Sequence, residues 1–244
     1  MNKTTLITAT IISLGFVIGV AIFANAIKNR NSSDNTISVT GLGSKTFTSD
    51  LITWSGSFSQ TDFELKKAYE LLKNDRETIQ DYLISKGIPK DQIIFSAVST
   101  YKKTNYITDE YGRRRDVFAG YELSQSVSIE SKDVEKIEAL SRNITEIINR
   151  GIEFTSSSPS YFYTKLSEVK HEMIAEATKD AKLRAQKIAE NSGAKLGKLK
   201  SARTGVIQIT APNSDEDYSY GGTFNTYSKE KEASITIRLE YMVD

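Results

Sequence analysis

The chain contains no cysteine among its 244 residues. This absence excludes disulfides, thiolate metal ligands, iron–sulfur clusters and cysteine nucleophiles. A single histidine, His171, is present, so a metal site or acid–base pair built on imidazole has only one candidate residue. The stability of the folded chain must therefore come from the burial of apolar side chains and from hydrogen bonds.

A large excess of positive charge is also absent. The chain has 32 basic and 31 acidic residues, and three of the basic ones (Lys3, Lys28 and Arg30) lie in the first 30 residues, which hold no acid. The rest of the chain thus carries slightly more acid than base. Binding to nucleic acid depends on clustered positive charge. We therefore expect no nucleic-acid partner.

The long uncharged stretch is at the N-terminus, over residues 4–27. As a helix it would span roughly 36 Å, which exceeds the about 30 Å of a bilayer's hydrocarbon core. The sequence predicts a single transmembrane helix within residues 1–30, a polar linker at 31–36, and an extracytoplasmic body on a cell-membrane anchor. The alternative is a cleaved signal peptide ending at Ala24-Asn25-Ala26, which would leave a soluble periplasmic protein.

The body, residues 37–243, alternates between two hydrophobic periods. Strands are expected where apolar residues recur every second position, and helices where they recur every three or four. Expected strands lie at 37–40, 52–59, 93–106, 116–130, 152–165, 198–210 and 230–242, and expected helices at 62–86, 133–149 and 166–191. This order mixes hairpins with helices and does not repeat βαβ units. It predicts an α+β fold, mainly antiparallel sheet with helices packed on it.

Two of the expected helices carry finer signals. The helix beginning at 133 is expected to be capped by Ser131 and ended by Gly151. The longest helix has alanines at 177, 181 and 185, and Ile188 and Ala189 are expected to continue the same side. Small side chains in such a row let a helix lie close to its neighbour.

Four segments, in this order and spacing, resemble the SIMPL (DUF541) family of bacterial envelope proteins. They are Ile37–Gly43, Gly87-Ile88, Gly120–Leu123 and Ala177–Gly197, and the likeness covers residues 36–243. The resemblance implies an extracytoplasmic or membrane-anchored protein, roles in oxidative or DNA-damage stress for some members, and ring-like oligomers in one branch. It implies no catalytic residue. Lys45–Ser49 departs from the family pattern, which has a proline-aspartate pair there.

No residue set in the chain suggests catalysis. There is no Gly-x-Ser-x-Gly elbow and no Ser-x-x-Lys context. His171 has Glu168 and Glu172 nearby, so a weak surface metal site is conceivable, but a solvent-facing helix position is expected. Asp215-Glu216-Asp217 lacks the spacing of a calcium loop and is expected at an exposed loop tip. We therefore expect no enzyme activity, no cofactor and no bound metal.

Six residues are predicted to contact a partner. Arg113, Arg114 and Arg115 form the basic run of an expected hairpin tip at 109–115, which is either simply solvated or meets anionic lipid headgroups or the acidic loop of a neighbouring subunit. Tyr218, Tyr220 and Phe224 interleave with that acidic loop, and tyrosines supply large contact area at low entropic cost.

The sequence thus predicts an anchored, homo-oligomerising scaffold or interaction protein of the cell envelope. The alternative is a periplasmic binding module that holds a small ligand or peptide between its sheet and the long helix.

Overall fold

The computed structural model describes residues 3–31, 35–108 and 112–243, with the side chains of the first helix described over 11–27. Residues 32–34 of the predicted linker lie outside the described residues. The chain divides into two compact units. Unit 1 consists of Met1–Lys45, Glu168–Gln208 and Ser234–Asp244, and unit 2 of Thr46–Ser167 and Ile209–Ala233.

The first element of unit 1 is the N-terminal helix α1 (Lys3–Asn31). All of its described side chains, at residues 11–27, are exposed. They include large apolar ones such as Phe16 and Phe23. Within the part of the chain that the structure describes, no helix reaches the length and apolarity needed to cross a membrane.

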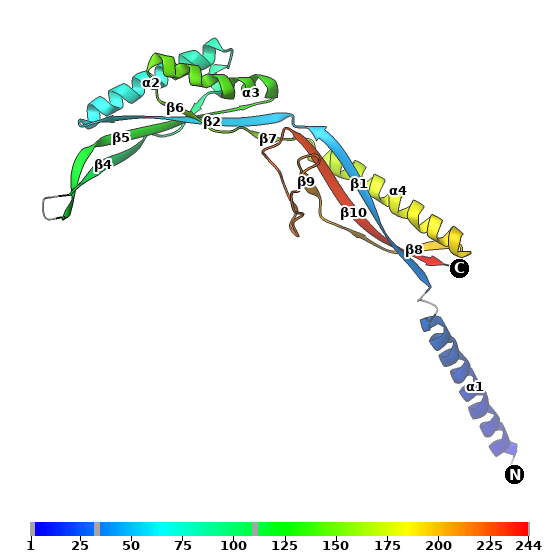
Figure 1. The fold of residues 1–244 in the computed structure, drawn as a ribbon. Coiled ribbons are helices and arrows are strands. Elements are labelled where there is room, and N and C mark those ends of the chain that lie inside the picture. Colours follow the sequence, from blue (N-terminus) through cyan, green and yellow to red (C-terminus); the bar gives the residue numbers. More distant parts are fainter. Residues whose placement is uncertain (1–2, 32–34, 109–111, 244) are drawn as a thin grey trace. The chain divides into compact units, whose positions relative to one another are not determined.

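The folded part of unit 1 is a sheet covered on one face by the long helix α4 (Leu166–Ser192), as Figure 1 shows. The sheet order is β1 (Thr36–Thr48), β10 (Glu230–Val243) and β8 (Leu196–Thr204), with β8 antiparallel to β10. As the alternating pattern predicts, Ile235, Ile237 and Leu239 of β10 are buried. The outward residues of the three strands remain in contact with solvent.

Helix α4 packs directly on β1 because both elements present small residues. The predicted alanine row is buried from Ala177 to Ala189. Opposite it, a Cβ added to Gly41 would lie 2.2 Å from the carbonyl oxygen of Ala177, and one added to Gly43 would lie 2.3 Å from that of Met173. The backbones therefore touch, and no space for a ligand remains between β1 and this helix.

The prediction for Ile188 is wrong, because its side chain is 49% exposed. The buried row advances in steps of four and includes Ala185 and Ala189. Ile188 precedes Ala189 by one residue, which places it about 100° away around the helix axis.

Unit 2 is built on two long antiparallel strands, β2 (Leu51–Asp62) and β5 (Arg114–Ser131). Shorter strands flank them: β3 (Ile94–Phe95) and β4 (Ser99–Thr108) pair with β5, and β6 (Phe154–Ser156) and β7 (Ser160–Phe162) with β2. Helices α2 (Leu65–Ser85) and α3 (Val134–Asn143) cover one face (Figure 1). The short helices are η2 (Lys90–Gln92) and η3 (Ile144–Arg150). The short strand β9 (Gln208–Thr210) belongs to the other sheet, where it pairs with β10. The predicted α+β fold with antiparallel sheets is confirmed.

The core of unit 2 lies between this sheet and its two helices. Trp54 is buried beside Phe154, with ring centroids 6.1 Å apart. Its indole N–H donates to the Ser156 hydroxyl at 3.0 Å, so the polar edge of the ring keeps a partner inside the core. The predicted apolar faces of β2 and α3 are confirmed, since Ile52, Ile137 and their neighbours in each pattern are buried.

Several predicted boundaries shift. The strand expected at 93–106 is two strands, β3 and β4, and the strand expected at 198–210 divides into β8 and β9. The end of the helix expected at 133–149 tightens into η3.

Ser131 is not the cap of α3: the Asp133 carboxylate accepts from the Lys136 N–H, while the Ser131 hydroxyl accepts from the Asp133 N–H. Asp133 caps the helix because its carboxylate reaches the free N–H three residues on.

Candidate functional site

The strands β4 and β5 extend beyond the rest of the sheet as a two-stranded ribbon. β2 pairs with β5 only as far as Tyr121. β4 continues to pair with β5 until Thr108 faces Arg114, and a β-bulge lies where the ribbon leaves the sheet. We call residues 104–108 and 112–118 the arm. Residues 109–111 of the predicted hairpin tip lie outside the described residues.

Both faces of the arm are open to solvent. Every residue of the arm is exposed, with Tyr106 at 73%. The strand register assigns the side chains to faces. Tyr106, Phe118 and Arg114 lie on one face, and Ile107, Val117 and Arg115 on the other. An isolated two-stranded hairpin is at best marginally stable in water, so a ribbon with apolar residues on both faces would be stabilised by a partner.

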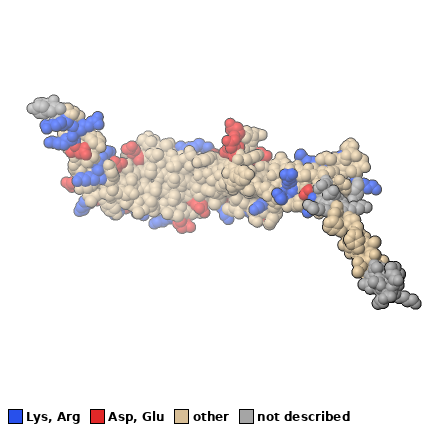
Figure 2. All heavy atoms as spheres, turned by 90° about the horizontal axis from the view of Figure 1, so that it is seen from below, with Lys and Arg blue, Asp and Glu red and all other residues tan. Residues whose placement is uncertain are grey.

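Basic side chains gather at the same end of unit 2, as Figure 2 shows. Arg113, Arg114 and Arg115 are exposed near the end of the hairpin, where the sequence predicts them. At the base of the arm, the Lys102 ammonium lies 5.3 Å from the Phe118 ring centre, and Lys103 pairs with Glu122 at 3.3 Å. The arm therefore combines positive charge with exposed aromatic surface.

The second predicted contact region is the segment at 211–229, which we call the tyrosine loop. Tyr218 is 70% exposed and Tyr220 is fully exposed. Phe224 is less available, because its ring stacks on Phe162 with centroids 6.4 Å apart. Asp215 and Asp217 are exposed, as predicted for a loop tip. That the six predicted residues contact a partner stays a prediction.

Polar contacts, two of them made by the buried residues Asn225 and Lys231, hold the tyrosine loop in place. The Glu216 carboxylate accepts from the Ala211 N–H at 3.1 Å and from the Asn225 side-chain amide. Lys231 is fully buried, and its ammonium donates to the carbonyl oxygens of Asn225 and Ser228. Burial lowers the pKa of Lys231 to about 8, although the negative charge of Glu216 acts in the opposite direction and raises this pKa. The loop is thus attached to unit 2 through a lysine that is costly to bury.

The buried lysine makes stability depend on pH. Its pKa is about 8 in the folded chain and near 10.5 when unfolded. Between these values the unfolded chain binds more protons, so the free energy of unfolding rises with pH. We expect the wild type to gain up to about 1.4 kcal/mol per pH unit relative to Lys231→Met. Urea unfolding of both chains from pH 8 to 10.5 measures this difference, and parallel pH profiles would contradict it.

The face of the unit 2 sheet away from its helices forms a charge-poor surface. On β2 it presents Thr53, Ser55, Ser57 and Ser59, which pair in register with Glu130, Ser128, Ser126 and Ser124 of β5. Figure 2 looks onto this side and shows few charged groups over these strands. Depletion of charge is typical of the central part of protein interfaces. This hydroxyl face lies next to the base of the arm.

The candidate metal residues do not come together. His171 is exposed on α4, and the adjacent Glu172 pairs with Lys45. Over the described ranges, no three His, Asp or Glu side chains gather in a way that would hold a metal ion. His171 and the Asp215–Asp217 triplet therefore carry no argument for a metal site.

The fold and the exposed surfaces define a class: an α+β protein with antiparallel sheets, whose most unusual surface is an uncovered ribbon. A family model described as SIMPL, a protein of unknown function (DUF541), matches residues 37–241. Because this match covers most of the chain, the protein belongs to the SIMPL family, as its sequence resemblance predicted. A search of curated proteins finds no match.

The apolar residues of the arm, Tyr106, Ile107, Val117 and Phe118, were not predicted as contact residues from the sequence. A signal for them exists. Between positions 101 and 108, apolar residues fall at both odd and even positions, as Tyr101, Tyr106 and Ile107 do. A strand with one buried face keeps its apolar residues at alternate positions, so apolar residues at both odd and even positions lie on both faces of the strand. Lys102 and Lys103 between them argue against burial of either face in a core.

Proposed function

We propose that this protein is an anchored interaction protein of the cell envelope that associates with further copies of itself through the arm and the tyrosine loop. The observation that supports it is the arm, a ribbon with an apolar surface and an arginine on each of its two exposed faces. Tyrosine, phenylalanine and arginine are the residues enriched in protein interfaces, and tyrosine and arginine supply many of their strongest contacts.

Charge complementarity favours a second copy of this chain as the partner of the arm. The arm carries Arg113–Arg115, and the tyrosine loop carries the exposed carboxylates of Asp215 and Asp217. Opposite charges arranged in this way steer association and fix its register.

The two surfaces lie at opposite ends of the sheet of unit 2. The loop contacts β7, where the Tyr161 N–H donates to the Thr226 carbonyl oxygen, and β7 pairs with the start of β2. The arm leaves beyond the last residues of β2, which pair with β5 as far as Tyr121. Contact between the arm of one copy and the loop of another is therefore either reciprocal, in a two-fold dimer of antiparallel copies, or head to tail, in a ring or a filament.

The uncharged stretch at residues 4–27 is longer than the part of α1 whose side chains the structure describes, 11–27, and we propose that this whole stretch lies in a membrane, with the body on the extracytoplasmic side. Residues 11–27 of this helix carry no charge and all of them are exposed. Water is a poor environment for so much apolar surface. Retention of the full chain in membranes washed with alkaline carbonate is expected, and quantitative release would remove this part of the proposal.

The absolute mass of the body, residues 31–244, tests self-association. Size-exclusion chromatography with light scattering should give a discrete multiple of the monomer mass. A monomer at every concentration would remove self-association, and would favour a binding module that recognises another molecule.

A further inference from the structure

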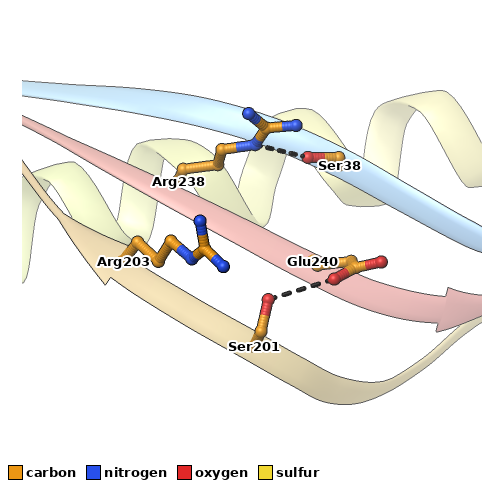
Figure 3. Close-up of a pocket in the computed structure, with 5 residues that line it drawn as sticks. All are labelled: Ser38, Ser201, Arg203, Arg238 and Glu240. Atoms are coloured by element: carbon orange, nitrogen blue, oxygen red, sulfur yellow. Dashed lines mark hydrogen bonds between the residues drawn. The ribbon is translucent and has the colours of Figure 1, made fainter.

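A second cluster of charged groups lies in unit 1, on the face of the sheet away from α4 (Figure 3). It surrounds a shallow cavity of about 210 Å³. The lining residues are Ser38 of β1, Ser201 and Arg203 of β8, and Arg238 and Glu240 of β10. None of them belongs to the arm or to the tyrosine loop.

Two arginines face each other across this cavity. Arg203 and Arg238 are directly opposite in the antiparallel register of β8 and β10, so their side chains project from the same face. Like charges in opposite positions destabilise a sheet. Nothing in the packing requires two arginines here, since both side chains are exposed.

The surrounding polar groups orient one arginine and leave the other available. The Arg238 Nε–H donates to the Ser38 hydroxyl at 3.0 Å, which fixes the direction of that guanidinium. Among the described residues, Arg203 has no hydrogen-bond or ion-pair partner, and its donors face the cavity (Figure 3). An arginine offers five N–H donors in a planar arrangement that suits oxyanions.

Glu240 has its own partners and does not neutralise Arg203. Its carboxylate accepts from the Ser201 hydroxyl at 3.1 Å and from the Lys200 ammonium at 3.3 Å. Hydrogen bonds from Ser201 and Thr36, together with Lys200, lower the pKa of Glu240. Two guanidinium groups therefore remain beside a carboxylate that is already paired.

We infer that this cavity is a binding site for a phosphate group, held between Arg203 and Arg238. Paired arginines bind phosphate through charge-assisted hydrogen bonds, often two from a single guanidinium. The bound anion would also remove the repulsion between the two arginines. In this arrangement Glu240 lies where it accepts a hydrogen bond from a hydroxyl group next to the phosphate.

The phosphate has two sources, a soluble phosphate ester or the headgroup of a lipid. Ser38 follows the last residue of α1, Asn31, by seven residues. A chain of that length reaches at most about 25 Å. If α1 lies in a membrane, as the proposed function has it, the cavity is within that distance of the end of the membrane helix and so close to lipid headgroups. The phosphate site itself does not depend on that placement.

Calorimetric titration of the full chain in a mild detergent tests the site with three probes. These are inorganic phosphate, glycerol 1-phosphate and dioctanoyl phosphatidic acid. We expect saturable binding of at least one probe, and we expect Arg203→Gln to weaken it by about tenfold or more. Lys182→Gln, on the exposed side of α4, makes the same change in charge within unit 1 and should leave binding unaltered.

Each result decides a part of the inference. Binding of the soluble phosphates identifies a soluble ligand, and binding of the lipid alone identifies a headgroup. Equal loss in Arg203→Gln and Lys182→Gln, or no saturable binding of any probe, would overturn the site. Unfolding of Arg203→Gln without phosphate provides a check on folding. Its midpoint should equal or exceed that of the wild type, because a like-charge repulsion has been removed.

Discussion

Gly41→Ala is expected to destabilise the body by about 3 kcal/mol, the upper end of the usual cost of overpacking. The added Cβ would lie 2.2 Å from the Ala177 carbonyl oxygen and 2.5 Å from the Ala181 amide nitrogen. Both are backbone atoms of α4, so no rotamer change relieves the clash. The helix must move away from β1 and give up the close packing of its alanine row. Urea unfolding of the body measures the loss.

Gly221→Ala is the matched control for this substitution. A Cβ at Gly221 has no atom within 4 Å, and its backbone does not adopt a positive φ. We expect a change of less than about 0.5 kcal/mol, as for other open surface positions. A Gly41→Ala chain as stable as Gly221→Ala would show that α4 does not rest on β1 as closely as described.

Reversal of charge in the arm should dissociate the assembly. Arg114 and Arg115 lie on opposite faces of the arm, so in the double variant Arg114→Glu/Arg115→Glu whichever face contacts the loop would present a carboxylate to Asp215 and Asp217 of the neighbouring copy. Juxtaposed like charges cost several kcal/mol at an interface, so we expect the dissociation constant to rise by about 100-fold or more. Light scattering of the body over a concentration series measures this constant, and raising the salt concentration should weaken wild-type association in the same direction.

The control for the reversal is Lys66→Glu/Lys73→Glu. These two lysines are exposed on α2 and make only long ion pairs of 3.9 Å with Glu70 and Glu77. The double variant has the same net charge as the arm variant but leaves the arm intact. If both variants dissociate equally, net charge governs association and the arm has no specific role.

Local patterns predicted much of the fold. The alternation in β2 and β10 and the apolar stripe of α3 are properties of neighbouring residues, so they can be read without knowing the partners of each element. The splitting of the strand expected at 93–106 depends on pairing: β3 and β4 contact different parts of β5. Pairing between distant segments has no local signature in the sequence.

The glycines at 41 and 43 illustrate the same limit. In the sequence, Gly41-Leu42-Gly43 is part of the resemblance to the SIMPL family, with no physical reason evident for these residues. The structure supplies one, because both glycines oppose the backbone of α4. The alanine row predicted that α4 approaches a neighbour closely, but it did not identify that neighbour. Matching the two requires the contact between segments more than 120 residues apart.

The candidate sites were predictable to different degrees. Arg113–Arg115 and the tyrosine loop stand out because basic runs and dense aromatics are local features. Arg203 and Arg238 are each unremarkable in the sequence, and only the register of β8 against β10 brings them together. Single charged residues on exposed strands are common, so no pattern within either strand distinguishes this pair.

Cross-linking tests directly whether the arm of one copy contacts the tyrosine loop of another. Because the chain has no cysteine, single cysteines can be introduced without competing thiols. Arg114→Cys and Asp217→Cys bodies are mixed under mild oxidation, with Lys182→Cys replacing the second in a control. A disulfide requires Cα atoms within about 7 Å, so it reports direct proximity. We predict rapid formation of the 114–217 mixed dimer and little of the 114–182 dimer. Equal yields of the two dimers, or none of either, would contradict the contact.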